Sequence, residues 1–99
     1  MNNTLEQTEL KKETFVRVRE TEKAIQVNCI FYYGTNSFHK IAKVWVPKSC
    51  LEFVEEKNIH GVRLVEEIKE WFWEKKYDEL VDIYGEPSWF EFDRNVNEE

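Results

Sequence analysis

A strict alternation of apolar and polar side chains over residues 24–46 constrains the fold more than any other feature of this chain. The segments AIQVNCIFYY (24–33) and FHKIAKVWV (38–46) each place every second residue on one side, which is typical of a strand with one buried face. Only GTNS lies between them, and a linker this short joins antiparallel strands. The sequence therefore predicts a β-hairpin. Its expected buried residues are Ile25, Val27, Cys29, Phe31, Tyr33, Ala42, Val44 and Val46.

The residues on either side extend this hairpin into a predicted antiparallel meander of three to four strands. ETFVRVRE (13–20) alternates, with Val16 and Val18 on the side expected to face the core. The opposite side carries Phe15, Arg17 and Arg19. Pro47 lacks an N–H group and therefore ends the strand that precedes it. LEFVEE (51–56) predicts a short fourth strand after this proline.

A helix is predicted over residues 62–76, where the apolar period changes from two to about 3.6. Val65, Ile68 and Phe72 lie on one face of such a helix, whereas the charged residues lie mostly elsewhere. This face is expected to pack on the aliphatic face of the strands. A Phe72 side chain buried in that core would contribute strongly to stability.

A break in the helix is predicted near residues 75–78, with Asp78 as a candidate N-cap. The reason is a second apolar stripe that is rotated by about half a turn relative to the first. Its members are Tyr77, Leu80, Val81 and Tyr84. Gly85 and Pro87 end this second piece, and SWFEF (88–92) is either a last short strand or a packed tail.

Strands followed by a helix predict a single α+β domain over residues 13–93. Residues 1–12 are expected to be a polar tail or a short helix that Thr4 and Gln7 cap, and residues 94–99 a polar tail. The chain shows no apolar leader and no run of about 18 apolar residues. We therefore expect a cytoplasmic protein without a membrane segment.

The sequence favours neither an enzyme nor a metal or cofactor site. Ser49 and Cys50 are adjacent nucleophile candidates, but no base or oxyanion-hole pattern accompanies them. Zinc sites usually bring ligands in close pairs, and no such pair occurs among Cys29, His39, Cys50 and His60. A disulfide between the two cysteines is sterically conceivable, although a cytosolic chain favours free thiols.

The charge is distributed unevenly along the chain, whose net charge is −6. Residues 1–49 hold eight Lys and Arg against five Glu, or +3, and residues 50–99 hold six against fifteen acidic residues, or −9. An acidic surface with exposed aromatic side chains favours a basic protein partner. The predicted binding residues are Glu70, Trp73, Glu74, Asp78 and Trp89. The alternative is that Trp73 and Trp89 pack on each other or on the second helix piece, and that the carboxylates form a solvated face.

A second hypothesis concerns the sheet face opposite the aliphatic one. Arg17, Arg19, Lys43 and Trp45 are expected on this face, and basic and aromatic side chains on one sheet face are typical of single-stranded nucleic-acid platforms. The net negative charge opposes this hypothesis. A water-exposed amphipathic sheet is the simpler interpretation.

Two short motifs carry a resemblance. EKAIQV (22–27), followed about twenty residues later by VWVPKS (44–49), resembles a group of small bacterial proteins that are common on phages and plasmids. The group usually has Gln where this chain has Cys50. The resemblance implies a mobile-element setting in a bacterial cytoplasm, where small acidic proteins often inhibit host defence, as anti-CRISPR proteins do. It implies no catalytic residue, and the motif itself is interpreted as a fold signature.

Overall fold

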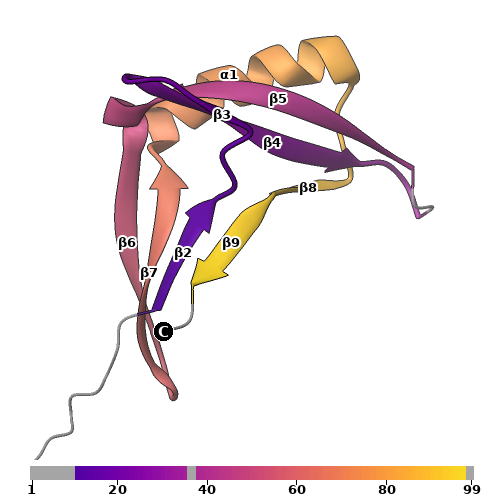
Figure 1. Ribbon diagram of the computed structural model, residues 1–99. Helices are drawn as coiled ribbons and strands as arrows, with labels where there is room; N and C mark the ends of the chain where they lie inside the picture. Colours follow the sequence, from indigo (N-terminus) through magenta and orange to yellow (C-terminus); the bar gives the residue numbers. More distant parts are fainter. Residues whose placement is uncertain (1–10, 36–37, 98–99) are drawn as a thin grey trace, which may run out of the picture.

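The computed structural model describes residues 11–35 and 38–97, which form one α-helix and eight strands in two sheets (Figure 1). The predicted α+β class is confirmed at this level. The predicted arrangement of one meander with a helix on it is not what forms, because a second sheet extends away from the first. The short helix expected around Thr4 and Gln7 lies outside the described residues.

The first sheet is built around the predicted hairpin. β4 and β5 pair antiparallel over their whole length, from Ala24 opposite Pro47 to Tyr32 opposite His39. The other edge of β4 pairs with β3 near its start and with β8 near its end. The strands of this sheet are β3 (Arg19–Glu20), β4 (Ala24–Tyr32), β5 (His39–Pro47) and β8 (Trp89–Phe92). The last segment is therefore a strand, one of the two predicted alternatives, and it takes the fourth place in the sheet instead of residues 51–56.

The second sheet has the order β6-β7-β2-β9, with β2 and β7 parallel and the other pairs antiparallel. Its strands are β2 (Lys11–Phe15), β6 (Leu51–Asn58), β7 (Gly61–Ile68) and β9 (Arg94–Asn97). Two predictions were wrong here: residues 62–68 are a strand rather than a helix, and residues 94–97 are a strand rather than a tail. Both faces of β7 are partly covered, so its apolar residues do not alternate strictly and imitate a helical period.

The helix α1 runs without a break from Glu70 to Tyr84. The predicted break near 75–78 was wrong, and Asp78 lies inside the helix instead of capping it. Four aromatic or aliphatic residues of the helix, spaced i, i+4, i+7 and i+11, form one stripe that runs through the predicted break. These residues are Trp73, Tyr77, Leu80 and Tyr84. Gly85 ends the helix as predicted, with φ at 86° and its N–H donating to the Val81 carbonyl at 2.8 Å.

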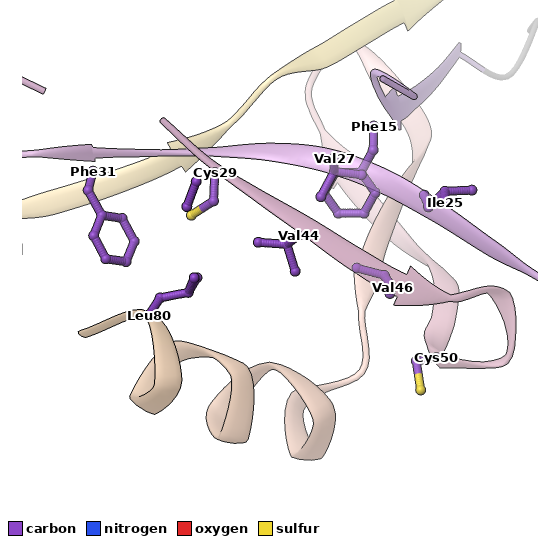
Figure 2. Close-up of a cluster of buried hydrophobic side chains, with 10 residues drawn as sticks. Phe15, Ile25, Val27, Cys29, Phe31, Val44, Val46, Cys50 and Leu80 are labelled. Carbon is purple, nitrogen blue, oxygen red and sulfur yellow. The ribbon is translucent and has the colours of Figure 1, made fainter. Parts of the chain in front are cut away.

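The main core lies between the first sheet and α1. Figure 2 shows Leu80 pointing from the helix toward the side chains of β4 and β5. The alternate residues of these strands are buried as the pattern predicts. Phe72 packs against this core but is only half-buried, so the full burial expected of it is not observed. None of the described residues forms a helix long and apolar enough to cross a membrane.

The segment between β2 and β3 joins the two sheets. Phe15, at the end of β2, is fully buried, whereas Val18 is exposed, which reverses the predicted faces of residues 13–20. The alternation fails because these residues are not one strand: the chain leaves the second sheet after Phe15 and enters the first at Arg19. The carboxylate of Glu66 in β7, whose residue is only 3% exposed, accepts hydrogen bonds from the Phe15 N–H at 3.0 Å and from Arg17.

Candidate partner-binding groove and outer sheet face

An open groove of about 350 Å³ lies between α1 and β8. Its aromatic lining is half-buried and consists of Trp73 and Tyr77 from the helix and Phe90 from the strand. The carboxylates of Glu74 and Asp78 are exposed and also line the groove. The groove therefore combines an aromatic floor with an acidic rim, and it includes three of the five predicted partner-binding residues.

Trp73 belongs to this floor rather than to the exposed surface. Its ring centroid lies 5.0 Å from that of Phe92 and 5.5 Å from that of Phe90. The prediction that it is exposed was wrong, because that prediction took its helical phase from Val65 and Ile68, which lie in a strand. The alternative of packing on the second helix piece applies to Trp73, whose ring centroid lies 6.0 Å from that of Tyr77, whereas Trp89 stacks on Tyr32.

Tyr77 and Phe90 are groove residues that the sequence analysis did not identify. Their ring centroids lie 5.5 Å apart, and Tyr77 also lies 5.9 Å from Phe31 in the core. The spacing of Trp73 and Tyr77 was a usable signal, since residues four apart share a helix face. No local signal could have placed Phe90 beside them, because the pairing of β8 with β4 is a long-range contact.

The groove has a negative electrostatic environment. Burial raises the pKa of the Tyr77 phenol, and the charges of Glu86 and Asp78 raise it further. Glu70, Glu74 and Asp78 follow one another at intervals of four along α1, and all three are exposed. A cation that enters the groove would meet carboxylates beside aromatic faces, two features that favour its binding.

Trp89 lies on the opposite face of β8 from the groove. It is 52% exposed and stacks flat on Tyr32, with a centroid distance of 4.0 Å and an angle of 9° between the rings. Successive residues of a strand point to opposite faces, so Trp89 and Phe90 cannot share one patch. The predicted acidic and aromatic surface is thus divided between the two faces of one strand.

The outer face of the first sheet, which points away from α1, carries most of the predicted nucleic-acid platform. Arg19 lies opposite Gln26, and Gln26 lies opposite Trp45, so these three form one cross-strand row. Lys43 lies in the next row of the same face, and Trp45 is 41% exposed. The structure brings Arg19, Lys43 and Trp45 to one face, as predicted.

Arg17 does not belong to this platform. Its Nη1 and Nη2 donate to the two carboxylate oxygens of Glu66, at 3.0 and 2.9 Å. This hydrogen bonding raises the pKa of Arg17 against the opposing effect of burial. Acidic groups also lie on the outer face: the Tyr32 hydroxyl donates to Glu91 at 2.6 Å, which raises the pKa of Tyr32.

The candidate nucleophiles and metal ligands do not assemble into a site. Cys29 and Cys50 are both buried and free, and burial raises the pKa of the Cys29 thiol to about 12. Ser49 is exposed in the short 3-10 helix Lys48–Cys50, which follows the predicted stop at Pro47. Within residues 11–35 and 38–97, no three or more His, Cys, Asp or Glu side chains are grouped so that they could hold a metal ion.

No family model, no curated protein and no solved structure matches this chain. The groove and the outer sheet face are therefore the features of this protein from which a function can be inferred. The phage and anti-CRISPR setting that residues 22–27 and 44–49 imply stays a prediction.

Proposed function

We propose that this protein is a non-catalytic binding protein that holds a basic protein partner in the groove between α1 and β8. The observation that carries the proposal is the aromatic floor of Trp73, Tyr77 and Phe90 beside the carboxylates of Glu74 and Asp78. Aromatic side chains that surround a pocket are common centres of protein interfaces. Carboxylates around such a centre accelerate the encounter with a basic partner and favour it over an acidic one.

The proposal identifies the partner by its chemistry alone: it is a protein with a basic surface. Nucleic-acid-binding enzymes of a bacterial host present such surfaces, and a CRISPR effector is the candidate that the sequence resemblance suggests. Inhibition would follow if the acidic groove covered a basic channel that the host enzyme uses for nucleic acid. This mode of action requires no catalytic group in the protein.

Charge reversal on the groove rim tests the proposal without disturbing the core. The double variant Glu74→Lys and Asp78→Lys changes two exposed side chains. A blocked peptide of alternating Arg and Thr serves as a defined basic probe, and calorimetric titration at low salt measures its affinity. We expect at least a tenfold loss of affinity relative to the unchanged protein.

The matched control reverses two exposed carboxylates of β6, Glu52→Lys and Glu55→Lys. It changes the net charge by the same amount, so it measures the contribution of overall charge alone. We expect this variant to lose much less affinity than the groove variant. Equal losses in the two variants would contradict a specific role of the groove.

Binding of single-stranded nucleic acid on the outer sheet face is the second candidate function. The row of Arg19, Gln26 and Trp45, with Lys43 beside it, supports this alternative. An exposed tryptophan offers a stacking surface for a base, and the cations would contact phosphates. The acidic side chains of Glu91 and Asp93 at β8 weaken the case.

A gel-shift assay with a thymidine oligonucleotide at low salt tests this alternative. If the oligonucleotide binds through the outer face, its affinity should fall as the salt concentration rises. Trp45→Ala should lower the affinity further. Trp71→Ala is the control, because Trp71 is a 59% exposed tryptophan on α1. The absence of any shift, or an equal effect of the two substitutions, would exclude the outer face as the binding site.

A further inference from the structure

β8 is an edge strand that borders the groove. Among the described strands it pairs with β4 alone. The Asp93 N–H, just after β8, donates to the Asn28 carbonyl at 3.3 Å. With Ile30 opposite Glu91 and Tyr32 opposite Trp89, this hydrogen bond indicates that the backbone groups of Trp89 and Glu91 point toward β4. By alternation, the N–H and C=O groups of Phe90 and Phe92 point to the opposite edge.

The groove runs beside this edge. Phe90 belongs to both features, since its ring lines the groove and its backbone lies at the edge. A strand added to β8 would lie about 4.8 Å further out. Its alternate side chains would then point to the helix side, next to Trp73, Tyr77 and the two rim carboxylates.

The free edge of β8 lies between the two faces that carry the predicted binding residues. Side chains of an added strand that point away from the helix would lie next to Trp89, which is half-exposed on the outer face. Trp73 and Trp89 thus flank one strand edge from opposite sides, although their rings do not form a common patch.

We infer that the partner binds as an extended basic segment that adds a strand to the free edge of β8 and directs alternate Lys or Arg side chains into the groove. This inference rests on the proposed function and specifies its mode of binding. Backbone hydrogen bonds to Phe90 and Phe92 would supply affinity, as in other cases of strand addition. The aromatic floor and the carboxylates of Glu74 and Asp78 favour Lys or Arg at those positions of the added strand that face the helix.

Backbone N-methylation of the probe peptide separates strand addition from simple charge attraction. Two versions of the blocked Arg and Thr peptide are compared, one N-methylated at every Arg and the other at every Thr. Only one of these two sets of N–H groups faces β8 in an added strand, because alternate groups point to opposite edges. We expect one version to lose at least tenfold in affinity and the other to bind as the unmodified peptide does.

Hydrogen exchange followed by NMR on the full chain provides the second measurement. The Phe90 and Phe92 amides are expected to exchange more slowly when the peptide is bound. If both methylated peptides bind equally and these amides gain no protection, strand addition is wrong while binding in the groove stands. If the unmodified peptide does not bind even at millimolar concentration, the proposed function fails and this inference with it.

The free protein provides the last control. Slow exchange of the Phe90 and Phe92 amides that depends on protein concentration would show that a second copy occupies the edge. Slow exchange that is independent of concentration would show that the chain itself covers it. Either result would contradict the inference that this edge is free to bind a basic partner.

Discussion

The two sheets of this protein each have four described strands but very different surroundings. In the first sheet, β4 and β5 bury every second residue against α1. In the second sheet, β6 is exposed along nearly its whole length, and Phe53 and Val54 are about half-exposed. Ion pairs link the neighbouring strands there, with Glu13 accepting from both Arg63 and Arg94.

This difference indicates where the stability of the fold comes from. Burial of apolar area is the dominant stabilising contribution, whereas ion pairs such as those of Glu13, whose partners are 20% and 37% exposed, contribute less. The first sheet with its helix should therefore form the stable unit that positions the groove. The second sheet depends on its attachment through Phe15 and through the pair of Glu66 and Arg17.

The largest expected effect comes from Phe31→Ala in the centre of the first sheet. Phe31 is fully buried and its ring contacts those of Tyr77, Tyr84 and Phe90. The substitution should lower the free energy of unfolding by about 3–5 kcal/mol in urea titrations. Phe53→Ala in β6 is the matched change in the second sheet and should cost less than about 1 kcal/mol. Similar losses at the two positions would contradict the difference between the sheets.

Arg17→Ala should have the next largest effect, because it leaves the buried Glu66 carboxylate without its cation. Leaving a buried acceptor without a hydrogen-bond partner typically costs about 1–3 kcal/mol, and the Arg17 side chain that is removed here is 32% exposed. Adding Glu66→Gln to Arg17→Ala should restore part of the stability, since the remaining side chain is then neutral. A double variant no more stable than Arg17→Ala would show that Arg17 acts only through packing.

Alkaline pH should weaken the first sheet through Cys29. Burial raises the pKa of Cys29 from its ordinary value of 9.0 to about 12. Above pH 9 the unfolded chain loses this proton and the folded chain keeps it, so stability falls as pH rises toward 12. Between pH 9 and 10.5 the loss from this group is about 2 kcal/mol. Cys29→Ala should flatten the curve of unfolding free energy against pH, and an unchanged slope would contradict the account.

The smallest expected effect is that of Glu13→Gln in the second sheet. This substitution weakens the ion pairs with Arg63 and Arg94 but keeps the shape of the side chain. The loss of stability should be smaller than that of Arg17→Ala, because Glu13 is 16% exposed whereas Glu66 is 3% exposed. Part of the loss should disappear at high salt, which screens ion pairs that solvent reaches. A loss as large as that of Arg17→Ala, and independent of salt, would show that the second sheet has a buried electrostatic core.

The sequence predicted what depends on local pattern. The alternation in β4 and β5, the stop at Pro47 and the helix end at Gly85 are confirmed because each follows from nearby residues. The second sheet was missed because β2 and β7 pair in parallel across about fifty residues, which no local pattern encodes. The start of the helix was placed too early because residues on both faces of β7 are partly buried, so its apolar residues do not alternate strictly.

The candidate site shows the same limit. Glu74 and Asp78 were predicted as binding residues from composition, and they do line the groove. Trp73 was named as a binding residue too, but its half-buried position depends on the true start of the helix. Trp89 was predicted to belong to the same binding surface, yet it lies on the face of β8 opposite the groove. The groove exists because β8 pairs with β4 near the helix, a contact between residues about sixty positions apart.

Chemical-shift mapping tests the groove most directly. The unmodified Arg and Thr peptide is titrated into the isotope-labelled full-length protein, and the amide and indole signals of each residue are followed. We expect the largest changes at the Trp73 indole, along residues 73–78 and along β8, with smaller changes elsewhere. Changes centred on the carboxylates of β6, or on Arg19, Lys43 and Trp45, would contradict binding in the groove between α1 and β8.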